Sequence, residues 1–265
     1  MDLGLKGKVA LVTAASKGLG FATAEQLLAE GASVMICGRD SASLDTAVAK
    51  LKTSYGADAP VAALSADVTA EAAAQTLVDG TVAAFGGLDI LVTNAGGPPA
   101  GTFDSTDISL WQKSFDLTVM SAVRLVKAAE PHLKASGSGA ILTITSMSVK
   151  FPVANLMLSN VIRPAVIGLT KALAQEYGAH GIRANSILPG YTRTDRIEYL
   201  LNQWADERGT TPDEEAAKLG ANLPLKRIGA PEEFGKVACF LCSSAASYMT
   251  GEMVLVDGGA YPGLM

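Results

Sequence analysis

The stretch KVALVTAASKGLGFATAEQLLAEGASVMICGRD, residues 8–40, decides the fold. An apolar run at 8–14 leads into a glycine-containing turn, which a helical pattern at 20–32 and a second apolar run at 33–38 follow. Continuously apolar runs are typical of strands buried on both faces, and a helix between two such strands predicts a parallel βαβ unit. Residues 8–40 therefore predict the start of an α/β domain.

The same alternation continues along the chain. Further apolar runs lie at 60–67, 88–96, 139–146, 182–190 and 253–259. Helical patterns separate them, including one long helix at 107–136 and another that ends near Gly178. With no repeat or linker, this pattern predicts one Rossmann-type, doubly wound domain over 1–265, with helices on both faces of a parallel sheet. Residues 192–228 have weaker strand patterns and predict a helical insertion that acts as a substrate lid.

Composition narrows the class of protein. The chain has 265 residues, 49% of them hydrophobic, which is enough to bury a large core, and a formal net charge of −5 with a pI near 5.1. An acidic chain is a poor match for nucleic acid or anionic membranes. No apolar run approaches the ~20 residues of a membrane span, and the start MDLGLKGKVALVTAA lacks the pattern of a signal peptide. A cytoplasmic protein acting on a small molecule is the expectation.

The three cysteines are Cys37, Cys239 and Cys242. The CFLC pair has the spacing of a redox or metal motif, but no second Cys or His pair accompanies it. It also lies in the apolar helical run FGKVACFLCSSA. We therefore expect no metal site and interpret both cysteines as small core residues.

The turn after the first strand, TAASKGLGFATA, predicts a phosphate site. Glycines at a strand-to-helix turn let the backbone approach a phosphate closely, and the helix N-terminus offers unpaired N–H groups. Ala14 stands where such turns usually carry their first glycine, so its backbone must adopt a conformation that alanine can reach. The turn residues predicted to contact a dinucleotide are Thr13, Ser16, Lys17, Gly18, Leu19 and Gly20.

The end of the second strand, ICGRD, indicates which dinucleotide binds. An acidic residue at this place would favour NAD, because it accepts hydrogen bonds from the ribose hydroxyls. Here Gly38 leaves room, and Arg39 can hold a 2′-phosphate. Lys17 adds a second positive charge from the turn. The pattern favours NADP (NADPH) over NAD, although two solvated surface cations would also explain it.

Several motifs in order resemble the short-chain dehydrogenase/reductase family, especially its 3-oxoacyl-carrier-protein reductase-like members. They are TAASKGLG (13–20), ADVT (66–69), TNAGG (93–97), ITSMS (144–148), AVIGLTKALAQEYGAHGIRANSILPG (165–190) and TGEMVLVDGG (250–259). The resemblance implies a seven-stranded parallel sheet, a homotetramer or homodimer, and hydride exchange between a nicotinamide and a carbonyl or alcohol. It also implies cofactor contacts at Asp67, Val68, Asn94, Ala95, Gly96, Pro189, Gly190 and Thr194.

The family's catalytic pattern is altered. The family uses an asparagine, a serine and a Tyr-x-x-x-Lys pair; the matching positions here are Thr118, Ser146, and then Ser159 and Arg163. A serine hydroxyl is a far weaker acid than tyrosine, and arginine keeps its proton. Arg163 can still bind the ribose hydroxyls, while Ser146 and Ser159 can donate hydrogen bonds to the reacting oxygen.

Two neighbouring residues bear on this change. Lys150 follows Ser146 by four residues and is a candidate proton donor, although an exposed surface lysine is an equal interpretation. Pro164 predicts a kink or a late start of the helix that carries Arg163, unless it occupies the first helical turn.

These observations favour an NADP-dependent oxidoreductase of this family with an altered active site. Two alternatives stay open. A non-catalytic relative would keep the fold and bind the cofactor, because three of the four catalytic positions differ. An isomerase or lyase on the same scaffold would form product without net oxidation or reduction.

Overall fold

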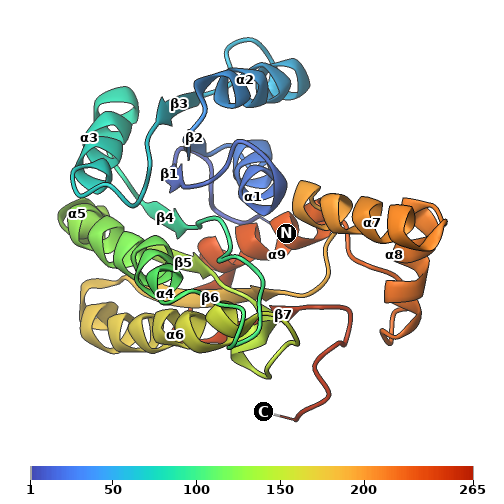
Figure 1. Cartoon of the computed structure of the whole chain (residues 1–265). Coiled ribbons are helices and arrows are strands. Elements are labelled where there is room, and N and C mark those ends of the chain that lie inside the picture. Colours follow the sequence, from blue (N-terminus) through green and yellow to red (C-terminus); the bar gives the residue numbers. More distant parts are fainter. Residues whose placement is uncertain (1, 265) are drawn as a thin grey trace.

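A computed structural model describes residues 2–264. Its strands form one seven-stranded parallel sheet with the order β3-β2-β1-β4-β5-β6-β7 (Figure 1). The strands are β1 (Val9–Val12), β2 (Ser33–Gly38), β3 (Val61–Ser65), β4 (Ile90–Thr93), β5 (Ala140–Ile144), β6 (Arg183–Pro189) and β7 (Met253–Val256). Each of these strands lies within, or matches, an apolar run of the sequence. The predicted doubly wound α/β class and the seven-stranded sheet are both confirmed.

Two helical layers cover the sheet. The helices are α1 (Gly18–Ala29), α2 (Ser41–Tyr55), α3 (Ala73–Phe85), α4 (Ile108–Phe115), α5 (Ser121–Ser136), α6 (Met157–Tyr177), α7 (Asp195–Arg208), α8 (Pro212–Ala221) and α9 (Pro231–Cys242). One core packs α1, α2 and α9 on one face, around Phe234 and Leu27. The other packs α3, α5 and α6 on the opposite face, around Leu77 and Leu125. Successive strand residues point to opposite faces, so Val12 joins the first core and Leu11 the second.

The strand order reverses between β1 and β4, which are hydrogen-bonded neighbours although they are far apart in sequence. The chain leaves β1 toward α1 and leaves β4 toward α4, so the two connections diverge above the carboxyl ends of these strands (Figure 1). Such a switch point is where open α/β sheets bind ligands. The fold therefore places the glycine turn after β1 beside the loop after β4.

The long helix predicted at 107–136 is interrupted. Between α4 and α5 the residues Asp116–Met120 form a π-helical turn. Inside this turn lies Thr118, and Ser121 Oγ, just after it, donates a hydrogen bond to the Leu117 carbonyl at 2.5 Å. Single π turns of this kind are frequent at functional sites. Here the turn changes which residues of the helical segment face the crevice.

The prediction for Pro164 needs correction. Helix α6 begins at Met157, and Pro164 lies inside it rather than before it or in its first turn. Ser159 and Arg163 are thus both on the regular helix. Packing of Leu158, Ile162 and Val166 in a common cluster with Val119 accounts for this, because tertiary burial outweighs the local cost of the proline.

Residues 192–228 contain α7 and α8, which pack against each other at the side of the molecule (Figure 1). The buried carboxylate of Glu215 joins them, because it accepts hydrogen bonds from Arg208, Thr210 and Lys218. Its neighbours, first Lys218 and then Thr210, hold the pKa of Glu215 at about 2. The carboxylate stays ionised at neutral pH and keeps the two helices together.

The cysteines are core residues, as predicted. Cys37, Cys239 and Cys242 are all buried, and none of them forms a disulfide. Burial raises the pKa of Cys37 to about 11 and that of Cys239 to about 12, so both thiols stay protonated at neutral pH. Within residues 2–264, no helix is long and apolar enough to span a bilayer.

Candidate active site

The glycine turn after β1 is built by close backbone packing. Ala14 adopts a positive φ of 48°, and its carbonyl accepts a hydrogen bond from Asn94 Nδ2 at 3.2 Å. A Cβ at Gly20 would collide with this carbonyl and come within 2.9 Å of Asn94 Nδ2. Only glycine fits at position 20, and it brings the N-terminus of α1 directly behind the turn.

Thr13 and Asn94 link the two connections that diverge at the switch point. Thr13 Oγ1 donates to the Asn94 carbonyl at 2.7 Å and accepts from the Asn94 N–H at 2.9 Å. Thr13 is fully buried, so its hydroxyl braces the β4 end. Asn94 itself is half-buried and continues into Ala95 and Gly96 along the crevice.

The second-strand end brings Ser16, Gly38 and Arg39 together. A Cβ at Gly38 would lie 3.4 Å from Ser16 Oγ, so the two residues are neighbours. Arg39 is exposed beside them. The next acidic residue, Asp40, caps α2 by accepting a hydrogen bond from the Ser43 N–H at 2.9 Å. This end of β2 thus presents an exposed guanidinium, while the next carboxylate in the sequence, Asp40, is engaged in the cap.

Asp67 and Val68 follow β3 on the same side. Asp67 accepts hydrogen bonds from the Thr69 N–H at 2.9 Å and the Thr69 hydroxyl at 2.8 Å. These bonds, with a smaller contribution from nearby Arg39, lower the pKa of Asp67. Val68 packs partly buried against the α3 side of the sheet. Asp67 thus lies near Arg39.

Lys17 is not directed at Arg39. Its Nζ forms an ion pair with the Asp195 carboxylate at 3.1 Å, and both side chains are mostly exposed. Asp195 begins α7, so the pair joins the glycine turn to the segment 192–228. An exposed pair of this kind contributes about 0–1 kcal/mol and is easily exchanged for another anion.

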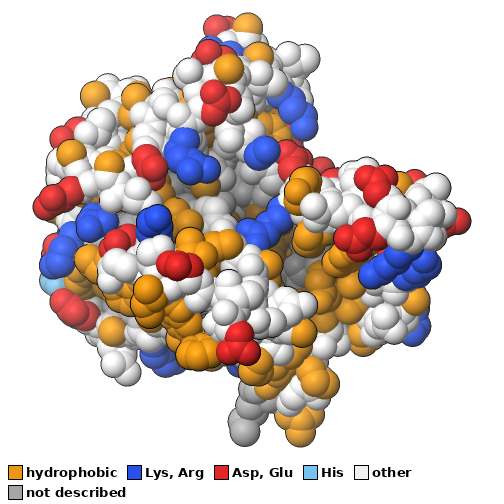
Figure 2. Space-filling view, viewed as in Figure 1, with side chains coloured by type: hydrophobic (Ala, Val, Ile, Leu, Met, Phe, Trp, Pro, Cys, Tyr) orange, Lys and Arg blue, Asp and Glu red, His pale blue; other side chains and the backbone are white. Residues whose placement is uncertain are grey.

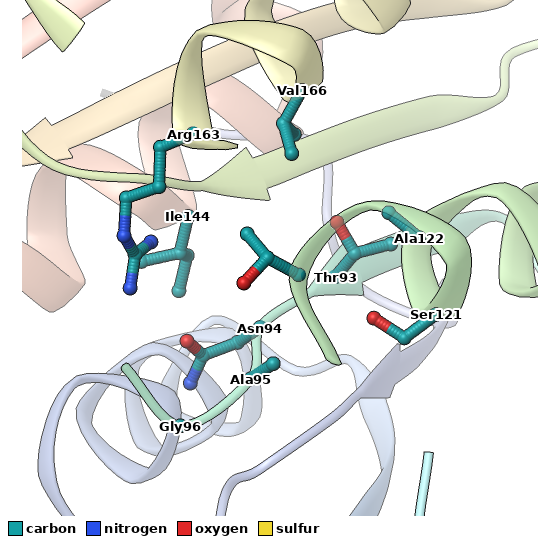
Figure 3. Close-up of a pocket in the computed structure, with 10 residues that line it drawn as sticks. Thr93, Asn94, Ala95, Gly96, Ser121, Ala122, Ile144, Arg163 and Val166 are labelled. Atoms are coloured by element: carbon teal, nitrogen blue, oxygen red, sulfur yellow. The ribbon is translucent and has the colours of Figure 1, made fainter. Parts of the chain in front are cut away.

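One cavity collects residues from both sides of the crevice (Figure 3). It is lined by Thr93, Asn94, Ala95, Gly96, Thr118, Ser121, Ala122, Ile144, Arg163 and Val166. Arg163 extends from α6 toward Asn94 and Gly96 (Figure 3). The structure therefore brings the predicted residues Asn94, Ala95 and Gly96 together with Thr118 and Arg163.

Two polar atoms of this cavity have no protein partner. Thr118 Oγ1 and Arg163 Nε are both shielded from solvent and make no hydrogen bond within the described chain. Arg163 Nη1 donates to the Thr145 carbonyl at 2.8 Å. Burial, and then the charge of Arg196, lowers the pKa of Arg163 to about 10, so the guanidinium remains positive at neutral pH. A buried polar group without a hydrogen-bond partner costs free energy of folding. A polar ligand or water in the cavity would supply the partner that these two atoms lack.

Three serines stand beside the cavity rather than in it. Ser146 Oγ accepts a hydrogen bond from the Ser148 N–H at 3.1 Å. The buried Ser159 hydroxyl lies 3.1 Å from Ser148 Oγ. Ser159 thus meets Ser148, a residue that the sequence prediction missed. The sequence ITSMS did show a second serine two residues after Ser146. Only the folded loop shows that this second serine faces α6.

Lys150 lies away from these groups, facing the C-terminal segment. Its Nζ is 5.9 Å from the ring centroid of Tyr261, and Phe151 stacks on the same ring with centroids 5.8 Å apart. Lys150 is half-buried. Tyr261 is a second residue that the sequence prediction missed, because nothing local connects position 261 with position 150.

The remaining predicted residues close the crevice from the β6 end. A Cβ at Gly190 would come within 2.6 Å of Asp257 Cα, so this glycine permits β6 and β7 to stay close at their ends. Pro189 ends β6. Thr194 precedes α7 and faces the turn, since a Cβ at Gly18 would lie 3.7 Å from Thr194 Cγ2. Two residues further on, Arg196 Nη2 donates to the Pro98 carbonyl at 3.1 Å; it too was missed.

The chain is similar in sequence to known dehydrogenases and reductases. The sequence profile described as "Enoyl-(Acyl carrier protein) reductase" matches residues 13–261. Dehydrogenase/reductase SDR family member 4 of Bos taurus is 37% identical over 97% of this chain and 88% of its own length. The 3alpha-hydroxysteroid dehydrogenase of Mediterraneibacter gnavus is 35% identical, over 98% of this chain and 99% of that one.

Solved structures of reductases share the fold of this chain. L-sorbose reductase from Gluconobacter frateurii, complexed with NADPH and L-sorbose, has a TM-score of 0.95 and 33% identity, with full coverage of both chains. Levodione reductase has a TM-score of 0.89 and 30% identity, covering 96% of this chain and 97% of that one. On sequence, sheet order and crevice alike, the chain belongs to the short-chain dehydrogenase/reductase family.

Proposed function

We propose that this protein is an NADP-preferring oxidoreductase that reduces a carbonyl, or oxidises the corresponding alcohol, through an altered catalytic set. Its family is one of nicotinamide-dependent dehydrogenases and reductases, so the reaction class follows from membership. The observation that carries the proposal is the shared cavity, in which Asn94, Thr118 and Arg163 meet beside the glycine turn. Its unpaired Thr118 and Arg163 atoms suit a polar ligand.

The residues present fit a dinucleotide. Gly20 lets the start of α1 pack directly against the Ala14 carbonyl, which keeps the turn tight, and Gly18, with a φ of 61°, faces Thr194. The N–H groups at the start of α1 suit the pyrophosphate. Asn94 and Gly96 would line the nicotinamide end, which Pro189, Gly190 and Thr194 would close from the opposite side. When bound, the nicotinamide supplies or accepts the hydride.

The preference for NADP rests on charge at the end of β2. Arg39 is exposed beside Ser16, and Gly38 leaves space between them. Asp40, the next acid in the sequence, is held in the cap of α2, and the nearby Asp67 carboxylate is bonded to Thr69. A 2′-phosphate would therefore meet a guanidinium and a hydroxyl, while both of these carboxylates have other partners. Lys17 can join them by exchanging its exposed Asp195 partner for the phosphate.

At the reaction site, the positive charge of Arg163 would stabilise the reacting oxygen. Arg163 contacts the carbonyl of Thr145, the residue before Ser146, so its positive charge lies next to the predicted oxygen-binding serine. Positive charge fixed near a developing alkoxide stabilises it. Ser146 would donate a hydrogen bond to that oxygen, and Ser159 would act with it through Ser148. Thr118 would hold a polar group or water in place of the family's asparagine.

The proton comes from elsewhere, because arginine does not release one readily and serine is a weak acid. Lys150 or water is the proposed donor. Lys150 faces the Tyr261 ring, at the edge of the same loop that carries Ser146 and Ser148.

Segment 192–228 is proposed to act as the substrate lid. Helices α7 and α8 form a unit around Glu215, and this unit touches the crevice through the first residues of α7. Figure 2 shows the α7–α8 unit projecting from the main body, with a groove between them. The first turn of α7 meets the main body through the exposed Lys17–Asp195 pair and the Arg196 hydrogen bond to the Pro98 carbonyl.

Self-association into a dimer or tetramer is part of the same proposal. Phe103, Ile108 and Val161 are all more than half exposed, and α4 packs on α6. Apolar side chains gathered on neighbouring helices are typical of an interface between subunits.

A non-catalytic, cofactor-binding role is the second candidate. It is favoured by the buried Ser159–Ser148 contact, which turns the hydroxyl at the family's tyrosine position away from solvent. In that case the protein would bind NADPH but consume none with any carbonyl compound. An isomerase or lyase would convert substrate while the amount of NADPH stays constant.

The test is a fluorescence titration with NADPH and NADH on the wild-type protein and on Arg39→Gln. We expect NADPH to bind at least 10-fold more tightly than NADH, and Arg39→Gln to remove most of that difference. Lys127→Gln, which removes an exposed cation on α5, is the matched control and should leave both affinities unchanged. Equal binding of the two cofactors would reject the NADP preference, and binding of neither would reject the proposed function.

A further inference from the structure

Three buried hydroxyl groups join α6 to the sheet. They belong to Thr143 of β5, Ser186 of β6 and Thr170 of α6, each at most 1% exposed, and we call them the hydroxyl cluster. Ser186 Oγ donates to Thr170 Oγ1 at 3.0 Å, and Thr170 Oγ1 donates to the Val166 carbonyl at 2.8 Å. Thr143 Oγ1 lies 2.6 Å from Ser186 Oγ and 3.0 Å from Thr170 Oγ1. Because Ser186 and Thr170 have each used their single proton, Thr143 is the donor toward this pair.

The hydroxyl cluster is one of two polar connections between α6 and the β5 segment. The other is the hydrogen bond from Arg163 Nη1 to the Thr145 carbonyl at 2.8 Å. Arg163 and Thr170 are about two helical turns apart and therefore lie on the same face of α6. Val166, whose carbonyl accepts from Thr170, lies between them and lines the same cavity as Arg163. The cluster thus holds the part of α6 that continues directly into the cavity wall.

The helix is weakened between these two connections. Pro164 directly follows Arg163 and has no N–H to donate to the carbonyl four residues earlier, that of Asn160. On the N-terminal side of the proline, the Asn160 side chain donates to the Val153 carbonyl at 2.9 Å, which lies in a loop and not in a strand. On the C-terminal side, the hydroxyl cluster reaches two strands. The position of Arg163 relative to the sheet therefore depends on the cluster more than it would in an unbroken helix.

A second buried threonine shows what is particular about the cluster. Thr81 of α3 is also fully buried, but its hydroxyl donates to the Leu77 carbonyl of the same helix at 2.7 Å, so this bond does not hold α3 against the sheet. Hydrogen bonds between elements are directional and fix their distance, and a fully satisfied buried polar network makes the surrounding structure rigid. Apolar contacts alone would let α6 slide more easily along β5 and β6.

We propose that Thr143, Thr170 and Ser186 are positioning residues, which hold Arg163 in place beside the Thr145 carbonyl so that its guanidinium meets the cofactor. This inference rests on the proposed function for the ligand of Arg163, whereas the holding itself is a property of the chain alone. Loss of one hydroxyl leaves the other two without a buried partner. The end of α6 that carries Arg163 is then free to shift.

The experiment compares Thr170→Val, Thr170→Ser and the matched control Thr81→Val with the wild type. Valine keeps the shape of threonine without its hydroxyl, and serine keeps the hydroxyl. NADPH affinity is measured by fluorescence titration. Hydrogen exchange at Arg163 Nε, which is shielded from solvent, is measured by NMR of arginine-labelled protein, with the signal assigned by its loss in Arg163→Met.

We expect Thr170→Val to weaken NADPH binding by about 10-fold or more, because small misplacements of a binding group have large effects. Exchange at Arg163 Nε should become faster by about the same factor. Thr170→Ser and Thr81→Val should stay within about threefold of the wild type in both measurements. Thermal unfolding is followed in parallel, and Thr170→Val and Thr81→Val should lower the Tm to a similar extent, so that the difference in binding is not an effect of stability.

Two results would overturn the inference. One is a Thr170→Val variant with unchanged NADPH affinity and unchanged exchange at Arg163 Nε. The other is an equal change in Thr81→Val, which would indicate a general effect of lost stability. Absence of NADPH binding by the wild type would reject the proposed function separately. The exchange measurement needs no cofactor and decides the positioning role in that case by the same comparison.

Discussion

The two sides of the crevice are built on different principles. On the side of β1, β2 and β4, the geometry depends on the backbone: Ala14 at positive φ, Gly20 against the Ala14 carbonyl, and Asn94 tied to Thr13. On the side of β5 and α6, it depends on side chains, among them Thr118, Ser159 and Arg163.

This difference indicates which part of such a site can change. A dinucleotide site made from tight turns and helix N–H groups tolerates little substitution, because a single added Cβ collides with backbone. A reaction site made from side-chain hydroxyls and charges can be exchanged one group at a time while the fold persists. In the proposed function, the chain retains the first kind of site and has altered the second.

The largest expected effect is on the backbone side. Gly20→Ala places a Cβ against the Ala14 carbonyl and within 2.9 Å of Asn94 Nδ2, so the turn must open. We expect the free energy of unfolding to fall by about 1–3 kcal/mol, and NADPH binding to weaken by on the order of 100-fold. Denaturant unfolding and the fluorescence titration measure the two effects.

Gly168→Ala is the matched control for that substitution. Gly168 lies in α6, and a Cβ there would meet nothing within 4 Å. The same chemical change should stabilise the protein by about 0.5–1 kcal/mol, through helix propensity. If Gly20→Ala behaved like Gly168→Ala, the turn would not depend on close backbone packing, and the comparison between the two sides would fail.

An effect of similar size, but of opposite sign for stability, is expected on the side-chain side. Arg163→Met removes a buried charge that has no acidic partner and an unpaired Nε. We expect the cofactor-free protein to gain stability, on the order of 1–4 kcal/mol, while NADPH-dependent turnover falls at least 100-fold. Thermal unfolding without cofactor and a steady-state assay measure the two quantities.

Arg183→Met separates this effect from a general effect of replacing arginine. Arg183 is also largely buried, but its guanidinium donates to the carbonyls of Leu241, Met249 and Ser243, at 2.9, 3.3 and 3.0 Å. Its loss should destabilise the protein, because three carbonyls lose their donors. Destabilisation by both variants would mean that Arg163 is a structural residue.

The smallest expected effect concerns Ala14. An alanine at a φ of 48° is strained by roughly 1–2 kcal/mol, whereas glycine adopts this conformation freely. Because glycine also costs more backbone entropy on folding, Ala14→Gly should stabilise the protein by about 0.5–1 kcal/mol, without changing NADPH affinity more than threefold. Ala24→Gly, in the middle of α1, should instead destabilise it by about 1 kcal/mol. A destabilising Ala14→Gly would show that the Ala14 methyl group packs favourably despite the strain.

Much of the fold could be predicted because each element carries its own pattern. Residues 33–38 were predicted as a strand and form β2 with those bounds, since six apolar or small residues end at a glycine and an α2 cap. The predictions failed where long-range packing decides. Residues 107–136 appear as one helix in a local pattern, but the π turn at Asp116–Met120 depends on what the segment packs against. Pro164 appears as a helix boundary for the same reason.

The site divides in the same way. The glycine turn and the family resemblance were sufficient to place Gly18, Gly20, Asn94 and Arg163 near one crevice, and Asn94 and Arg163 do line a common cavity. The sequence could not reveal that Ser148 meets Ser159, that Tyr261 covers Lys150, or that Arg196 rests on Gly97. Local sequence sets backbone direction and hydrophobic face over a few residues. Contacts between side chains far apart in sequence form only when the helices and loops pack, so the partners of Lys17, Ser159 and Arg196 belong to the folded molecule.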